Sequence, residues 1–290
     1  YAPPPAAAVK EAKDFFPFID AFGQYIHADW PGKTHSLEEL KQRAAAEEKE
    51  LAETSGPEQW DQYGGWKNGP SLEPTGFFRV QKHDGLWWLV DPEGRLFWSH
   101  GVDCVNTHIA TPIEERAEWF KDFPGGQPEF KSFLSKQYAL HGHYKGRTVQ
   151  CFDFGPANLL RKYGPEWKPK MAEMAHRRLR SWGLNTIANW SDTYISRAAQ
   201  EGRGVLRTPY TATVYFKGKL LEGSEGYWGK FRDVFDPSFR EAIRKAMAAQ
   251  AGKGAGDPWC LGFFVDNEIA WGDEVSLALA ALQSPPEQAA

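Results

Sequence analysis

The segment 263–268, with the sequence FFVDNE, places two carboxylates and an amide directly after an apolar run that begins at Cys260. A short apolar run of this kind predicts a buried strand. A carboxyl group at the end of such a strand, partly shielded from water, can protonate a leaving oxygen as a general acid. Glu268 is therefore the leading candidate for a catalytic group. The alternative is that Asn267 and Glu268 only cap the following helix and face water.

Other candidate residues follow the other strands expected in this half of the chain. Short strands are expected at residues 96–103, 184–188, 209–216 and 260–266, with helical patterns between them. The carboxyl ends of parallel strands meet at one edge of the sheet, where binding residues gather. The candidates for substrate binding at these ends are His100, Asp103, Asn189, Trp190, Tyr215, Asn267 and Trp271. The two tryptophans can stack on sugar rings or simply fill the core, and the imidazole of His100 can serve a structural hydrogen bond instead.

The helices between these strands carry clear sequence signals. Apolar residues repeat every three or four positions over 166–182, and Gly183 follows as a helix end. Asp236 and Pro237 have the residue types preferred at a helix start. Nearer the N-terminus, Ser36 opens a capping box before a charged helix that runs to about residue 54.

Two further regions have less regular patterns. Three runs at 76–80, 86–90 and 96–100, joined by short turns, predict an antiparallel meander. Residues 104–165 are expected to be rich in loops, with helical pieces near 113–120 and 129–138.

Alternating strands and helices predict an α/β fold of the (β/α)₈-barrel type. Only four βα units can be counted, whereas a complete barrel needs eight in about 250 residues. The expected domains are an N-terminal extension with a helix and a loop at 1–75, and a meander running into a half barrel at 76–290. A half barrel leaves open sheet edges and exposed apolar surface, so a homodimer or a second chain is expected to complete it.

The composition narrows the class of protein. Among 290 residues, 34 Lys and Arg against 38 Asp and Glu give a formal charge of −4, so nucleic acid is not an expected partner. The sequence lacks the apolar run of about 18 residues that a membrane helix requires. The contents of 13 Trp, 10 Tyr and 19 Phe suit a large core or a sugar-stacking cleft. His141 and His143 have no further ligand at a recognised spacing, so neither a metal nor another cofactor is expected.

Several longer strings resemble the β-agarases of glycoside hydrolase family 50 and their relatives. The matching segments are 22–25, 27–32, 61–66, 75–79, 87–94, 97–102, 265–268 and 271–272. The resemblance implies a retaining hydrolase of a galactose-containing polysaccharide, with Glu268 as the acid/base and Asn267 holding the sugar 2-hydroxyl. The family's nucleophile is a second Glu on the seventh barrel strand, and no position of this sequence corresponds to it.

The expected function is therefore hydrolysis of a β-linked polysaccharide, agarose or another β-galactan, in an extracellular or periplasmic setting. One alternative is a non-catalytic carbohydrate-binding protein derived from such an enzyme. Another is a glycosidase in which a local carboxylate, from Asp103, Asp192 or Asp266, assists Glu268 in a different geometry.

Overall fold

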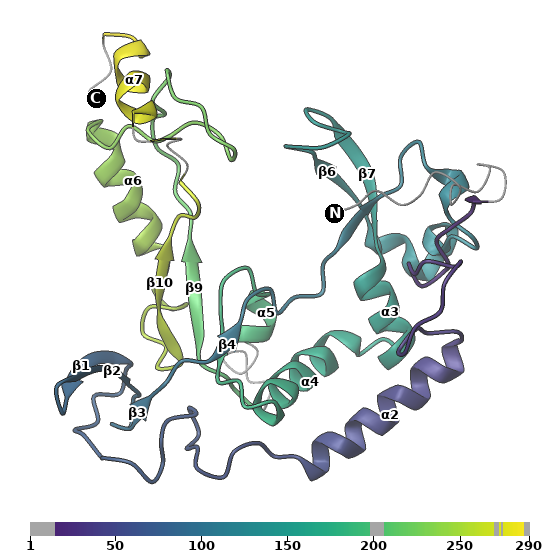
Figure 1. The fold of residues 1–290 in the computed structure, drawn as a ribbon, viewed down its shortest axis with the longest axis horizontal. Helices are drawn as coiled ribbons and strands as arrows, with labels where there is room; N and C mark the ends of the chain where they lie inside the picture. The colour runs from purple at the N-terminus through teal and green to yellow at the C-terminus, as the bar shows by residue number, and fades with distance from the viewer. Residues whose placement is uncertain (1–14, 198–205, 270–272, 274, 287–290) are drawn as a thin grey trace, which may run out of the picture. The chain divides into compact units, whose positions relative to one another are not determined.

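The computed structural model describes residues 15–197, 206–269, 273 and 275–286 (Figure 1). The chain divides into two compact units. Unit 1 holds Tyr1–Glu53 and Thr107–Met171, and unit 2 holds Thr54–Asn106 and Ala172–Ala290.

A four-stranded parallel sheet forms the centre of unit 2. Its strands are β4 (Gly101–Val102), β8 (Thr186–Ile187), β9 (Tyr210–Val214) and β10 (Cys260–Val265), and they lie in the order β10-β9-β8-β4. The order of the strands across the sheet follows their order along the chain, with the three strands of unit 1 inserted between β4 and β8. Figure 1 shows β9 and β10 side by side with their arrowheads pointing the same way. All four carboxyl ends therefore reach the same edge.

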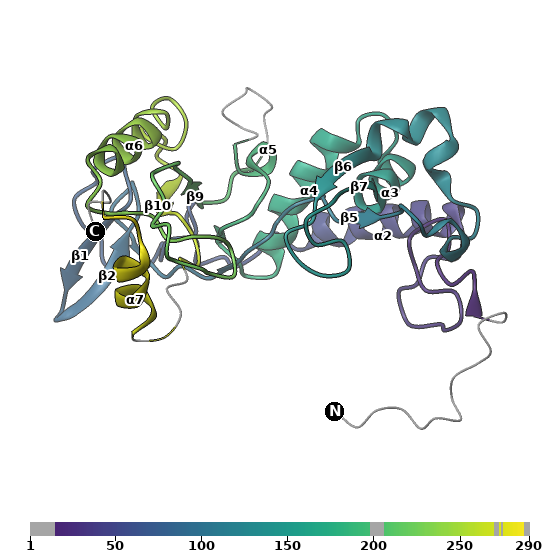
Figure 2. The ribbon, with the colours of Figure 1, turned by 90° about the horizontal axis from the view of Figure 1, so that it is seen from above.

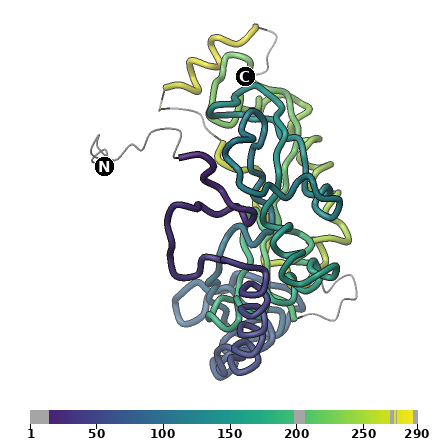
Figure 3. Tube along the Cα trace, turned by 90° about the vertical axis from the view of Figure 1, so that its right-hand side faces the viewer, coloured from purple at the N-terminus to yellow at the C-terminus, as the bar shows by residue number. Residues whose placement is uncertain are grey.

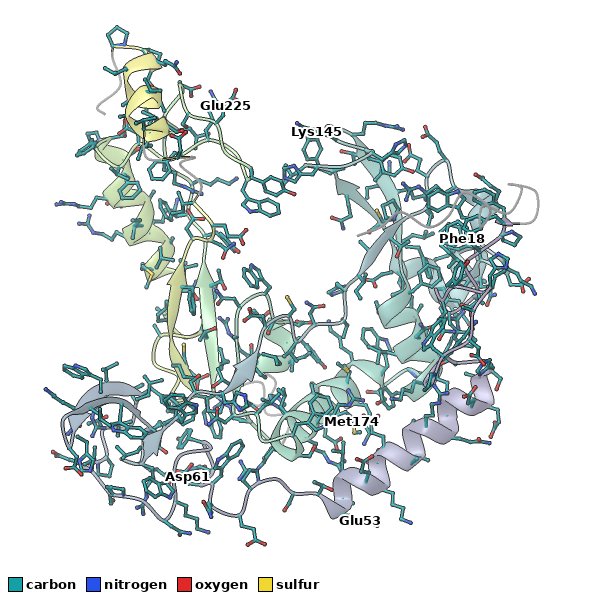
Figure 4. The ribbon with its side chains drawn as sticks, in the orientation of Figure 1. Phe18, Glu53, Asp61, Lys145, Met174 and Glu225 are labelled. Atoms are coloured by element: carbon teal, nitrogen blue, oxygen red, sulfur yellow. The ribbon has the colours of Figure 1, made fainter. Side chains whose placement is uncertain are left out.

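Helices follow the strands at the expected places. They are α4 (Trp167–Ser181), α5 (Thr193–Ser196), α6 (Pro237–Ala248) and α7 (Ser276–Gln283). Met174 of α4, labelled in Figure 4, is fully buried. The Asp236 carboxylate accepts a hydrogen bond from the backbone N–H of Ser238 and so caps α6 as the sequence predicts. Viewed from above, α6 lies beside the sheet (Figure 2).

The meander of unit 2 consists of β1 (Arg79–His83), β2 (Leu86–Val90) and β3 (Leu96–Phe97), all antiparallel. The expectation of one strand over 96–103 was wrong, because β3 and β4 belong to different sheets. The Asn185 side chain explains the break: its Oδ1 accepts from the His100 N–H at 2.8 Å and its Nδ2 donates to the Trp98 carbonyl at 3.0 Å. These side-chain hydrogen bonds replace those of a continuing ladder.

Two aspartates meet beneath this meander. Asp61 Oδ1 accepts the N–H groups of Tyr63 and Gly65, and Asp91 Oδ1 accepts those of Glu93 and Arg95. The Oδ2 atoms of both aspartates are buried next to Gly65. A Cβ added at Gly65 would lie 2.2 Å from Asp91 Oδ2 and 3.1 Å from Asp61 Oδ2. Burial, with the hydrogen bond to Asp61, raises the pKa of Asp91 to about 7. Asp91 therefore carries a proton below about pH 7 and donates it in a hydrogen bond to Asp61. Asp61 is labelled in Figure 4.

Unit 1 contains an antiparallel sheet that the sequence did not reveal. Its strands β5 (Ala110–Pro112), β7 (Thr148–Asp153) and β6 (Leu134–Tyr138) lie in that order. The helical piece expected near 129–138 was therefore wrong beyond residue 133, because residues 134–138 pair with β7. The pieces at Ala117–Trp119, Pro124–Gly126 and Pro128–Phe133 are short 3₁₀ turns.

Aromatic packing stabilises unit 1. Its core contains the side chains of Phe120, Phe130, Phe152, Phe154 and Ala157. Phe154 belongs to α3 (Phe154–Tyr163), which Asp153 caps. Trp119 packs against this core, and the Phe18 ring (labelled in Figure 4) lies 5.1 Å from that of Trp119, centroid to centroid.

The charged helix of unit 1 is α2 (Leu37–Glu53), whose regular turns Figure 3 shows. The Glu39 N–H donates to Ser36 Oγ at 3.1 Å, so half of the predicted capping box is confirmed. The Glu39 carboxylate instead accepts from the N–H of His35. Lys162 and Lys170 each form an ion pair with a glutamate of α2 at 2.8 Å.

Candidate active site

A cavity of about 360 Å³ opens in unit 2 where β9 and β10 end. Two segments complete its wall: the strand-end loop that contains Trp190, and the loop 228–232. The lining side chains with recognisable chemistry are Trp190, Tyr215, Trp228, Arg232, Asp266, Asn267 and Glu268. The cavity thus combines aromatic surfaces with carboxylate, amide and guanidinium groups, the mixture expected of a small-molecule or sugar site.

The backbone around this cavity is strained. Asp266, Glu268 and Trp190 have φ values of 65°, 45° and 59°, in the left-handed region that side chains rarely adopt. Such residues cost about 1–3 kcal/mol each and cluster at functional sites. The Asp266 N–H still donates to the Val214 carbonyl at 2.9 Å, so the pairing of β10 with β9 continues up to the point where the chain turns. The left-handed residues therefore set the directions of the side chains immediately after the sheet.

Glu268 is exposed in the cavity and is held by one tryptophan. Trp228 Nε1 donates to Glu268 Oε2 at 2.5 Å. A hydrogen bond to one carboxylate oxygen fixes the orientation of the group and leaves the other oxygen available for proton transfer. Sequence reasoning missed Trp228; its signal was an aromatic pair, Tyr227 and Trp228, inside a polar and glycine-containing loop.

Asp266 has a different environment from Glu268. Its side chain is 7% exposed and forms an ion pair with Arg232. The same guanidinium donates to the Phe216 carbonyl at 2.8 Å and lies 4.7 Å from the centroid of the Phe216 ring. Arg232 was also missed, because no local pattern marks the partner of a distant carboxylate. Asp266 is thus held in an ion pair, whereas Glu268 is the exposed acid that faces the cavity.

The cavity brings together four of the predicted site residues: Trp190, Tyr215, Asn267 and Glu268. Trp190 and Tyr215 also line an adjoining cavity of about 220 Å³. Trp271 lies outside the described residues.

The remaining candidates lie elsewhere in unit 2. Asn189 is buried, and its Oδ1 accepts from Thr211 and Thr213 of β9 at 3.2 Å each. Asp103 follows β4 and is exposed. His100 lines a separate cavity beside the meander. Asp192, considered as a local carboxylate, caps α5 by accepting from the Tyr194 N–H.

The described residues contain no group of three or more His, Cys, Asp or Glu side chains placed to hold a metal ion. His143, one half of the pair considered from sequence, packs edge-on against Tyr144 in unit 1. Throughout the residues that the structure describes, no helix is both long and apolar enough to cross a membrane.

Comparison with known proteins gives a consistent result. No family profile matches the sequence. β-Agarase B of Vibrio sp. (strain JT0107) is 32% identical over 88% of this chain and 28% of its own length. β-Agarase A of the same organism is 26% identical over 88% of this chain and 26% of its own length.

Two solved structures have the same fold over nearly the whole chain. PfGH50B matches with a TM-score of 0.82 and 26% identity over 96% of this chain and 42% of that one. An exo-β-agarase matches with a TM-score of 0.80 and 26% identity over 97% and 43%. The chain therefore spans less than half of the relatives it matches. The expected resemblance is confirmed: over most of its length this chain is similar to part of the β-agarases of glycoside hydrolase family 50.

Proposed function

We propose that this chain is part of a glycosidase that cleaves a β-linked polysaccharide, agarose or another β-galactan, with Glu268 as the general acid/base. One observation carries the proposal: the Glu268 carboxylate is presented in an aromatic cavity at the ends of β9 and β10, with one oxygen held by Trp228. The agarases that resemble the chain support the choice of substrate.

In this proposal the free oxygen of Glu268 protonates the glycosidic oxygen as the bond breaks and later accepts a proton from the attacking water. Trp190 and Tyr215 provide surfaces on which sugar rings stack, and Asn267 holds a hydroxyl beside the reacting carbon. Hydrolysis with retention also needs a nucleophilic carboxylate about 5–5.5 Å from the acid/base. Asp266 is poorly placed for this role, because its side chain is buried and is held by Arg232.

We infer that the nucleophile lies outside this chain. The four parallel strands then represent half of a (β/α)₈ barrel, and a further segment, a second chain or a second copy supplies the rest. The exposed side chains of Phe264 and Val265, 53% and 44% accessible on the outer strand β10, fit such a completion. A polymeric substrate favours an extracellular or periplasmic location.

The test is release of reducing ends from agarose and a panel of other β-linked polysaccharides, measured on the assembly in which the rest of the barrel completes this chain. Glu268→Gln is expected to lower the release at least 100-fold, because the amide cannot donate a proton. Glu225→Gln is the matched control: Glu225, labelled in Figure 4, is exposed and lines a different cavity. Unchanged release by Glu268→Gln would contradict the assignment. The first-formed anomer, read by NMR, distinguishes retention from an inverting reaction assisted by a local carboxylate.

A second candidate function is sugar binding without hydrolysis. Its supporting observation is that, among the described residues, Glu268 and the paired Asp266 are the only carboxylates that line the cavity. It predicts that oligosaccharides bind without release of reducing ends, and that Glu268→Gln leaves their affinity unchanged. Native mass spectrometry separates the two cases further, because a well-folded monomer that releases no reducing ends would favour binding alone.

A further inference from the structure

A second cavity in unit 2, of about 380 Å³, is lined by four tryptophans. We call it the tryptophan cavity; its side chains include Trp60, Trp66, Trp88, Trp98, Gln59 and His100. His100 comes directly before β4, whereas Glu268 comes after β10. Because the strands are parallel, the tryptophan cavity lies toward the amino-terminal edge of the sheet and the Glu268 cavity lies at the carboxyl-terminal edge.

One buried amide organises the wall of the tryptophan cavity. Asn185 is 4% exposed, and its Nδ2 donates to the carbonyls of Gly64 and Trp98 at 3.1 and 3.0 Å. Its Oδ1 accepts from the His100 N–H at 2.8 Å. A buried polar group with all these partners fixes the segments that it joins. The loop at Gly64 and the chain at 98–100 are therefore held in one arrangement before any ligand arrives.

Trp66 is held equally firmly. Its N–H donates to the Leu96 carbonyl at 2.8 Å, and its carbonyl accepts from the Gly69 N–H at 3.1 Å. A Cβ added at Gly69 would lie 2.4 Å from the Trp66 ring, so glycine permits the indole to lie against this backbone. The ring of Trp66 thus lies close against the backbone at Gly69.

The rings of two of these tryptophans are open to solvent. Trp66 is 47% exposed and Trp98 is 76% exposed. Rigid, exposed indoles cost little conformational entropy on binding and offer flat apolar area. Gln59 and His100 add polar groups beside them. A hexose ring matches this combination, since it presents C–H groups on its face and hydroxyls at its edge.

We propose that the tryptophan cavity binds a stretch of neutral polysaccharide, separate from the Glu268 cavity. The choice of a galactan as ligand rests on the proposed function. The site itself depends on Trp66, Trp98 and the Asn185 scaffold. Such a site keeps the polymer at the protein without taking part in bond cleavage.

The experiment uses ¹⁹F NMR of this chain labelled with 5-fluorotryptophan and titrated with an agarose hexasaccharide. Single Trp→Phe variants assign the signals of Trp66, Trp87, Trp98 and Trp228. Trp87 is the matched internal control, because it is 71% exposed but does not line the cavity. The background is Glu268→Gln, which prevents turnover.

We expect the Trp66 and Trp98 signals to shift and saturate together while the Trp87 signal stays in place. Trp98→Ala should weaken this binding roughly tenfold, the size expected for losing one stacking contact. A shift confined to Trp228 would overturn the second site while supporting the proposed function. Shifts at Trp66 and Trp98 without one at Trp228 would support the second site and count against sugar binding in the Glu268 cavity. A soluble paramagnetic agent that leaves the Trp98 signal sharp would show a closed cavity and would also overturn the proposal.

Discussion

The proton that Asp91 holds beside Asp61 makes the stability of unit 2 depend on pH near neutrality. Asp91 is fully buried and has a pKa of about 7 in the folded protein, against 3.8 for an ordinary aspartate. Between these values the folded state holds a proton that the unfolded state has released. The free energy of unfolding therefore falls as pH rises, and the stabilisation present below pH 3.8 is lost as pH passes through about 7.

The size of the effect follows from the two pKa values. Each pH unit in this interval costs about 1.4 kcal/mol, so the whole loss is about 4 kcal/mol. Between about pH 5.5 and 8 the expected loss is about 2 kcal/mol. For a chain of this size that corresponds to a fall of about 4 °C in the melting temperature.

The assay is chemical or thermal unfolding across this pH range for wild type and Asp61→Asn. The asparagine keeps the oxygen that accepts from Tyr63 and Gly65, while its amide can donate to the Asp91 carboxylate and thereby favour the charged form. The pH dependence should therefore shrink in this variant.

Asp20→Asn is the matched control. Asp20 Oδ1 closes the same kind of turn, accepting from the N–H groups of Phe22 and Gln24, in unit 1. The stability of the Asp20→Asn variant should depend on pH as that of the wild type does. Equal slopes for wild type and Asp61→Asn would refute the role of Asp61 in raising the pKa of Asp91.

Three further variants test the packing. Gly65→Ala should destabilise the protein by about 1–3 kcal/mol, because its Cβ would lie 2.2 Å from Asp91 Oδ2. The control Gly126→Ala has open space at its Cβ and should leave the stability nearly unchanged. Equal urea midpoints for the two variants would contradict this prediction. Met174→Ala should lower the free energy of unfolding by about 2–5 kcal/mol, because it leaves a cavity at a fully buried position. A loss below about 1 kcal/mol in urea unfolding would show that the neighbouring side chains fill this cavity. Asp236→Ala should cost about 1 kcal/mol by removing the cap of α6, with Asp236→Asn retaining most of the stability in the same measurement.

The parts of the fold that sequence predicted best are those with local signals. The 3.6-residue period and Gly183 predicted α4, and Asp236 with Pro237 predicted the start of α6. The positions of strand ends were sufficient to bring Trp190 and Glu268 to one cavity.

The features that sequence missed depend on distant partners. Residues 134–138 become a strand only because β7 lies beside them, and helical propensity cannot register that pairing. Trp228 and Arg232 become site residues only when their loop folds over the ends of β9 and β10. Asp61 and Asp91 are 30 positions apart, and each alone is an ordinary turn aspartate.

The paired strands of the parallel sheet are separated by chain segments of very different length, and this difference affects the order in which they fold. Gly101 of β4 pairs with Thr186 of β8, 85 positions away, whereas Ile187 pairs with Tyr210, only 23 positions away. Closing the longer loop costs more chain entropy, and β4 contributes only two residues in return. We therefore expect β8, β9 and β10 to associate first and β4 to join late. Pulse-labelled hydrogen exchange should then show protection at Ile187 and along β10 before it appears at Val102, with β4 the last strand to form and the first to open.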